Sequence, residues 1–111
     1  MLPKNRRIQR KLFPFNIKAL RLQSPLLFLS VAKNKDKEPT RFAFSISKKS
    51  ISSAVKRNLC RRRGYSVISS KLLAVKPGFL CFFSFKKIKT PPDYNELEKE
   101  ISSLLAEADV V

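Results

Sequence analysis

The sequence predicts a single α+β domain, and three observations support this class. Apolar and polar residues alternate in the strand pattern over residues 42–46, an arginine-rich stretch with helical spacing follows, and a near-continuous apolar run occupies residues 79–85. The 111 residues, of which 43% are hydrophobic, are enough to bury one modest core. We therefore expect one domain spanning residues 1–111.

The first part of the chain predicts a short helix followed by strands. Residues 4–12 could form a helix that Pro14 would end, because proline clashes with the preceding helical turn. Residues 26–32 predict a strand, and the polar run 33–39 is a loop that leads to a second strand over residues 41–47. These two strands are expected to pair as a hairpin.

The second of these strands has two chemically different faces. Phe42, Phe44 and Ile46 form an apolar face, whereas Ser45 and Ser47 lie on a face of small and polar residues. Small side chains would let a ligand approach the sheet on that side.

A basic helix is expected from about residue 50 to Leu73. Ser50, Ser52 or Ser53 can cap it, since a serine hydroxyl accepts a hydrogen bond from an unpaired amide of the first turn. At roughly 100° per residue, Cys60, Gly64 and Val67 lie on the buried side. Arg63 falls near that side, so its side chain must extend toward solvent or the helix must bend. The residues on the exposed side are Arg57, Asn58, Arg61, Arg62 and Tyr65.

The last third of the chain predicts an internal strand and a helix that packs on it. Residues 79–85 are apolar almost throughout, as in a strand covered on both faces. Asp93, followed three residues later by Glu96, resembles a capping box that starts a final helix. The face of this helix that is expected to pack on the sheet contains Leu97, Ile101, Leu104, Leu105 and Ala108.

Charge is segregated along the chain. Residues 1–92 contain 23 Lys and Arg but only two acidic residues, a net charge of +21, whereas the segment from Asp93 onward carries −5. Lys and Arg that neutralise phosphates release counterions, so a polyanion is the expected partner. Nucleic acid is favoured over a membrane surface, because a membrane binder would show one long basic helix with a continuous apolar face. The longest apolar run is also far short of the ~20 residues that cross a bilayer.

The composition does not favour catalysis by the protein itself. The chain has no His to act near neutral pH, and its basic part has no pair of carboxylates. Cys60 and Cys81 form no closely spaced pair, so we expect small buried hydrophobes rather than nucleophiles, zinc ligands or a disulfide. No metal site, bound cofactor or small-molecule substrate is expected, and a reducing cytoplasm fits this cysteine usage.

One motif is more specific than the composition. Residues 47–49, Ser-Lys-Lys, are followed after a short spacer by residues 54–62, Ala-Val-Lys-Arg-Asn-Leu-Cys-Arg-Arg. This order and spacing resemble the signature of the bacterial ribonuclease P protein component, in which Ser-Lys-Lys ends a strand and Ala-Val-x-Arg-Asn-Arg-x-Lys-Arg-x-x-Arg forms the next helix. The chain departs from that signature at Leu59 and at Tyr65, where the family has arginine.

The resemblance implies a fold and a function. The implied fold is a two-layer sandwich with the element order αβββαβα, a mainly antiparallel four-stranded sheet and a left-handed βαβ crossover, although physical reasoning alone favours a right-handed one. A third early strand would have to come from residues 15–23. The implied role is that of the ribonuclease P protein subunit, which binds the catalytic ribonuclease P RNA and helps it hold precursor tRNA for removal of the 5′ leader. The RNA and its Mg²⁺ ions would do the chemistry.

Two groups of site residues follow from the motif and the resemblance. A leader cleft would include Phe13 or Phe15, and Ser45 and Ser47 are better candidates for its floor. Burial is the common outcome for phenylalanine, so Phe13, Phe15 and Phe28 are each expected in the core. The group expected to contact RNA consists of Lys48, Lys49, Lys56, Arg57, Asn58, Arg61, Arg62 and Tyr65.

Two other functions fit the composition. A ribosomal or other structural RNA-binding protein would have the same size, charge and lack of catalytic groups, and only the spacing from Ser-Lys-Lys to Arg-Asn separates the two roles. A basic DNA-binding regulator would need a recognition helix with groove-reading side chains. Residues 50–73 are too rich in arginine and too poor in Asn and Gln to favour it.

Overall fold

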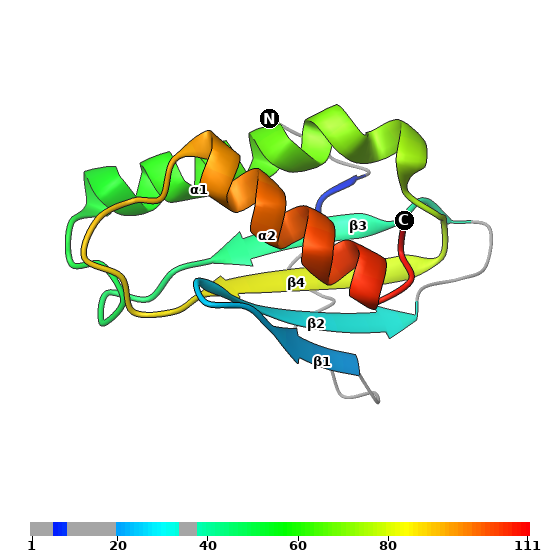
Figure 1. Ribbon diagram of the computed structural model, residues 1–111, viewed down its shortest axis with the longest axis horizontal. Coiled ribbons are helices and arrows are strands. Elements are labelled where there is room, and N and C mark those ends of the chain that lie inside the picture. Colours follow the sequence, from blue (N-terminus) through cyan, green and yellow to red (C-terminus); the bar gives the residue numbers. More distant parts are fainter. Residues whose placement is uncertain (1–5, 9–19, 34–37) are drawn as a thin grey trace.

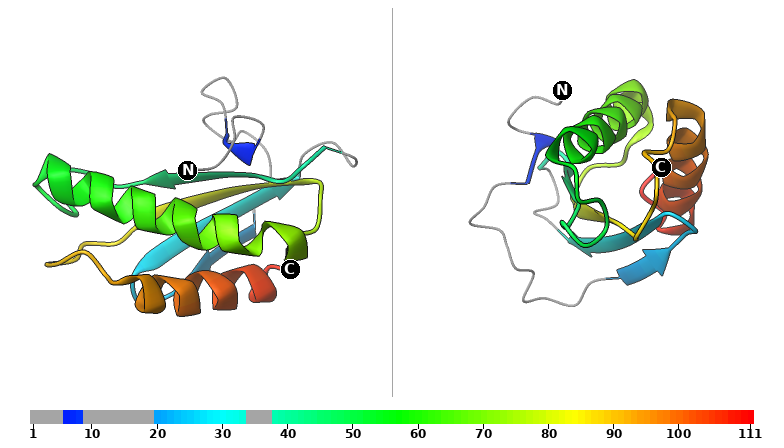
Figure 2. Two further views of the ribbon diagram at one scale, coloured as in Figure 1. Left: turned by 90° about the horizontal axis from the view of Figure 1, so that it is seen from above. Right: turned by 90° about the vertical axis from the view of Figure 1, so that its left-hand side faces the viewer.

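The computed structural model describes residues 6–8, 20–33 and 38–111, which form a two-layer α+β sandwich. Figures 1 and 2 show both helices on one face of a four-stranded sheet. The described elements, in chain order, are β1 (Leu20–Gln23), β2 (Leu27–Lys33), β3 (Arg41–Ser45), α1 (Ala54–Lys71), the short 3-10 helix η3 (Leu72–Ala74), β4 (Phe79–Phe85) and α2 (Tyr94–Glu107).

The strands lie in the order β1-β2-β4-β3, so β4 is internal as predicted. β1 pairs with β2 and β2 with β4 in antiparallel fashion, whereas β3 runs parallel to β4. In Figure 1 both β3 and β4 point to the left and α1 lies in front of the sheet, so the connection from β3 through α1 to β4 is left-handed. This is the crossover that the family resemblance implies.

The predicted hairpin between residues 26–32 and 41–47 is wrong, because β4 separates β2 from β3. The apolar β4 has both faces to cover and takes an inner position, while the short β1 supplies the hairpin partner of β2. A tight turn joins β1 and β2, in which the Ser24 amide donates to the Leu27 carbonyl over 2.8 Å. The third early strand expected within residues 15–23 is this β1.

The core lies between the sheet and the two helices. Phe42, Phe44 and Phe83 contribute its aromatic part from β3 and β4, and the rings of Phe44 and Phe83 stack with centroids 4.8 Å apart. All five residues on the predicted apolar face of the last helix are buried as expected: Leu97, Ile101, Leu104, Leu105 and Ala108.

Both main helices begin where the sequence predicts. The hydroxyl of Ser53 accepts a hydrogen bond from the Lys56 amide over 3.3 Å at the start of α1, and the Asp93 carboxylate accepts one from the Glu96 amide over 2.8 Å at the start of α2. At its other end α1 continues into η3, which closes near the predicted limit at Leu73.

The helix expected over residues 4–12 lies mostly outside the described residues. Arg7 forms an isolated parallel bridge with Phe42, and the Ile8 amide donates to the Phe42 carbonyl over 3.0 Å. Residues 7 and 8 therefore pair with β3 and are not helical.

No helix within the described ranges has the length and apolar character needed to span a membrane.

Candidate nucleic-acid interface

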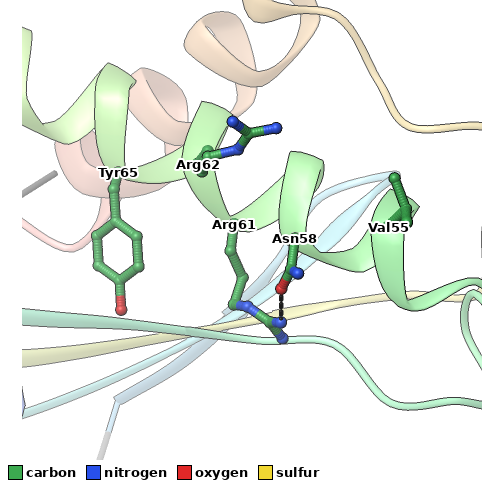
Figure 3. A pocket seen from close by; sticks show the side chains of 5 residues that line it. All are labelled: Val55, Asn58, Arg61, Arg62 and Tyr65. Carbon is green, nitrogen blue, oxygen red and sulfur yellow. Dashed lines mark hydrogen bonds between the residues drawn. The ribbon is translucent and has the colours of Figure 1, made fainter.

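The exposed side of α1 carries a basic pocket, called here the arginine pocket. It has a volume of about 430 Å³ and opens between the helix and the edge of the sheet (Figure 3). It is lined by Val55, Asn58, Arg61, Arg62 and Tyr65, so the structure brings together four of the five residues predicted on this side of the helix.

The buried side of α1 determines that the arginine pocket faces outward. Cys60, Gly64, Val67 and Ile68 are the buried residues of the helix. A Cβ atom at Gly64 would come within 2.7 Å of the Phe44 ring, so only glycine allows this approach of helix to strand. Gly64, which costs helix propensity, therefore brings the arginine-bearing helix close to β3.

Tyr65 connects the arginine pocket to the sheet. Its hydroxyl accepts a hydrogen bond from the Phe44 amide over 3.4 Å, and its ring meets the Phe44 ring edge-on with centroids 5.0 Å apart. The Tyr65 ring is only partly buried. Its outer part forms one wall of the pocket, below which β3 runs in Figure 3.

The arginines of α1 differ in what they contact. The guanidinium of Arg61 donates to the side-chain oxygen of Asn58 within the pocket, while Arg62 extends in another direction into solvent (Figure 3). Arg57 instead donates to the backbone carbonyls of Ile51 and Ser52, over 2.8 and 2.7 Å. Arg57 thus holds the loop that precedes the helix, in addition to its predicted role toward RNA.

Arg63 is half-buried and contacts the segment before α2. Its guanidinium donates to the Pro92 carbonyl over 2.8 Å, which links α1 to the segment before α2. Arg63 therefore satisfies its guanidinium through this contact with the Pro92 carbonyl, which the sequence did not predict.

A second basic pocket, called here the lysine pocket, lies at the N-terminal end of α1 and has a volume of about 250 Å³. The predicted Lys48, Lys49 and Lys56 line it, as do Lys87 and Lys89 from the segment after β4. Sequence reasoning missed the last two. The available signal was the run Lys86-Lys87-Ile88-Lys89, which follows β4, because β4 runs parallel to β3 and Ser-Lys-Lys follows β3.

The face of the sheet opposite the helices carries the third group of candidates. Ser45 and Phe28 both pair with Ser84, so these three side chains share this face. Ser47 lies beyond the end of β3, where its hydroxyl oxygen is 3.1 Å from the Ser50 amide that donates to it. Phe13 and Phe15 lie outside the described residues.

Phe28 is not the core residue that the sequence analysis favours, because 48% of it is exposed. The Lys86 ammonium lies 4.8 Å from its ring centroid, and a pocket of about 270 Å³ opens beside it, with Arg21 and Phe82 among the lining residues. The missed signal is strand parity: Phe28 shares its parity with Ser30, and the buried Leu27 and Leu29 share the other.

The described residues contain no cluster of three potential metal-ligating side chains. Both cysteines are buried and free, as predicted. Burial raises the pKa of the Cys81 thiol to about 12, and it also raises the pKa of Cys60, although the charges of Arg63 and Arg61 oppose that shift. Thiols with raised pKa values are poor nucleophiles.

The acidic C-terminal segment has structural contacts. The Glu100 carboxylate accepts hydrogen bonds from the Ser24 hydroxyl and, over 2.8 Å, from the Leu26 amide, so α2 holds the turn between β1 and β2. Glu98 lies 3.6 Å from the Lys71 ammonium of α1. Neither Glu98 nor Glu100 lines either of the two basic pockets.

Comparison with known proteins assigns this arrangement to a family. Searched against curated protein sequences, the chain finds no match. A mutant RNase P protein of Staphylococcus aureus with defective mRNA degradation activity has a similar structure, with a TM-score of 0.83 and 18% identity over 96% of this chain and 90% of that one. The RNase P protein of Thermotoga maritima is also similar, with a TM-score of 0.72 and 17% identity over 81% of this chain and 84% of that one. The family model for Ribonuclease P matches residues 2–109, and the chain therefore belongs to the ribonuclease P protein family.

Proposed function

We propose that this chain is the protein subunit of ribonuclease P, which binds the catalytic RNA and the 5′ leader of precursor tRNA and so assists 5′ maturation of tRNA. The observation that carries the proposal is the family match over residues 2–109, together with the arginine pocket on the helix that holds the family motif. The protein would be an accessory subunit and perform no bond cleavage itself.

The arginine pocket suits a phosphate backbone. Guanidinium groups match phosphate oxygens bidentately, and the Asn58 amide can both donate and accept hydrogen bonds. The first turn of α1 contains no acidic residue, so no carboxylate of that turn opposes an approaching polyanion. The substitution of arginine by Leu59 removes a charge from the family pattern, and the neighbouring Arg61, Arg62 and Arg63 keep this stretch strongly basic.

The chemistry would be supplied by Mg²⁺ ions held by the RNA. The chain would contribute positive charge, which reduces the repulsion between the ribonuclease P RNA and precursor tRNA and so increases their affinity for each other.

The open face of the sheet suits a single-stranded leader. The exposed Phe28 ring offers a stacking surface, and base stacking on an aromatic side chain is worth about 1–3 kcal/mol. The Lys86 ammonium lies over this ring and Arg21 lines the pocket beside it, so both add positive charge nearby, while Ser45 and Ser84 leave room above the strands. We therefore add Phe28 to Ser45 as a leader-contacting residue.

Multiple-turnover cleavage of precursor tRNA by a bacterial ribonuclease P RNA at low Mg²⁺, with and without this protein, tests the proposal. We expect the protein to stimulate cleavage, and to do so more for a substrate with a long leader than for one with a leader of a single nucleotide. Salt-sensitive RNA binding without any stimulation would contradict the proposal and favour a ribosomal or other structural RNA-binding role.

A matched pair of variants sharpens the leader assignment. Phe28→Ala should remove most of the leader-dependent part of the stimulation. Leu73→Ala removes a fully exposed apolar side chain elsewhere, from η3, and should leave the stimulation unchanged. Equal effects of the two variants would exclude Phe28 from the leader site.

A further inference from the structure

The lysine pocket contains residues that the family motif does not include. Lys48, Lys49 and Lys56 come from the motif and its flank, whereas Lys87 and Lys89 come from a segment more than thirty residues later in the chain. All five side chains are exposed, and no acidic residue lines the pocket. Five like charges around one hollow repel each other, and a bound polyanion would relieve that repulsion.

Hydrogen bonds fix the two segments that form the pocket to one another. The Ser50 hydroxyl donates to the Phe85 carbonyl over 3.2 Å, and the Ile88 amide donates to the Ser50 carbonyl over 3.4 Å. On the helical side, the two bonds from Arg57 to the carbonyls of Ile51 and Ser52 hold the same loop against α1. These hydrogen bonds order the backbone segments that carry the lysines. The conformational entropy of these segments is therefore lost on folding and not on ligand binding.

The lysine pocket lies next to the arginine pocket. Val55 lines one and the adjacent Lys56 lines the other. Lys56 and Arg62 are six residues apart, which is ~9 Å along a helix axis, so a short run of nucleic-acid backbone can contact both. The N-terminal end of the α1 dipole adds partial positive charge on the lysine side.

We propose that the lysine pocket is a second binding site for RNA phosphodiester groups, in which Lys87 and Lys89 complete the half formed by Lys48, Lys49 and Lys56. This inference rests on the proposed function for the identity of the RNA, and on the five lysines for the chemistry of the ligand. Phosphodiester groups of the ribonuclease P RNA and of precursor tRNA have the same chemistry, and binding to each RNA separately distinguishes them.

The test uses the full chain and the double variant Lys87→Ala/Lys89→Ala. Its control, Lys33→Ala/Lys99→Ala, removes the same charge from exposed positions elsewhere. Lys33 pairs with Phe79 at the opposite end of β4 from the pocket, and Lys99 lies on α2. Affinity for each RNA is measured between about 50 and 200 mM salt.

We expect the pocket variant to bind RNA about tenfold more weakly than the control variant at ~0.1 M salt, with a salt slope lower by up to about two phosphate contacts. A loss seen with only one of the two RNAs assigns the pocket to that RNA. If the pocket variant and the control variant bind both RNAs equally, Lys87 and Lys89 contact no phosphate and the proposal is overturned.

A titration with pyrophosphate separates this inference from the proposed function. In amide NMR spectra, pyrophosphate should shift resonances of residues 50–56 and 86–89, and the Lys87→Ala/Lys89→Ala variant should lose those shifts while keeping any at Asn58 and Tyr65. If pyrophosphate shifts these resonances but the protein does not stimulate cleavage, the lysine pocket is supported as a phosphate site and the proposed ribonuclease P function is contradicted. Unchanged shifts in the variant would overturn the pocket.

Discussion

The two long helices cover the same face of the sheet but bury different residues. α1 buries the small or β-branched Cys60, Gly64, Val67 and Ile68, whereas α2 buries three leucines and an isoleucine. A helix that packs through small residues lies close to the sheet on a narrow contact and leaves most of its surface for other use. The comparison shows that α2 contributes mainly packing, whereas α1 packs on the sheet and also presents the charged surface that we propose binds RNA.

Charge follows the same division. α2 begins at the acidic cap Asp93, and its Glu98 and Glu100 contact Lys71 and the turn between β1 and β2. α1 has no acid in its first turn and bears the arginine pocket on its outer side. These three acidic residues therefore contribute to the fold, and none of them lines the arginine pocket, where a carboxylate would repel RNA.

The largest effect on stability is expected from a substitution in α2. Ile101 is completely buried, and Ile101→Ala should lower the free energy of unfolding by about 2–5 kcal/mol, because the lost methyl groups leave a cavity between helix and sheet. Urea denaturation followed by circular dichroism measures this change. Ser103→Ala, at an exposed position of the same helix, should change it by less than about 0.5 kcal/mol. A small effect of Ile101→Ala would mean that α2 is not the main packing helix.

A smaller loss is expected at the contact between α1 and β3. Gly64→Ala gains about 1 kcal/mol of helix propensity, but its Cβ would come within 2.7 Å of the buried Phe44 ring, which is stacked on Phe83. Overpacking costs about 1–3 kcal/mol, so we expect a net loss near 1 kcal/mol in the same urea experiment. Ser66→Ala is the control, since Ser66 is exposed on α1 and its gain in propensity is unopposed. Equal stabilisation by both variants would show that the helix does not need glycine here.

Much of α1 and α2 could be predicted from local sequence signals. Caps and hydrophobic periodicity act over a few residues, so Asp93 and the five buried positions of α2 follow from the sequence directly. For α1 the sequence leaves three candidate serine caps, of which Ser53 is the one observed. The outward direction of the α1 arginines follows from the same helical phase. The left-handed crossover does not follow from such signals and comes from the family resemblance alone.

Pairing between distant segments could not be predicted in this way. The hairpin assigned to residues 26–32 and 41–47 fails because β4, almost forty residues later, takes the place between them. The predicted set of RNA-contacting lysines lacks Lys87 and Lys89 for the same reason, because these two residues follow β4 and meet the other three only in the fold. The prediction that Phe28 is a core residue is wrong because it relied on the usual burial of phenylalanine. The alternation of the strand places Phe28 on the same face as Ser30 and opposite the buried Leu27 and Leu29.

The smallest effect on stability, and the clearest effect on binding, is expected at Arg62. Arg62 is exposed in the arginine pocket, so Arg62→Ala should change the free energy of unfolding by less than about 0.5 kcal/mol. It should weaken binding of ribonuclease P RNA and lower the salt slope by about one phosphate contact.

Lys99→Ala provides the matched control for Arg62→Ala, because it removes one exposed positive charge from α2 instead of α1. If only the net charge of the chain mattered, the two variants would weaken RNA binding equally and would have the same salt slope. The division between the helices requires that Arg62→Ala lowers the slope and that Lys99→Ala leaves it unchanged, because a lysine on the packing helix contacts no phosphate. Equal slopes would show that RNA responds to the total charge of the molecule and not to the surface of α1.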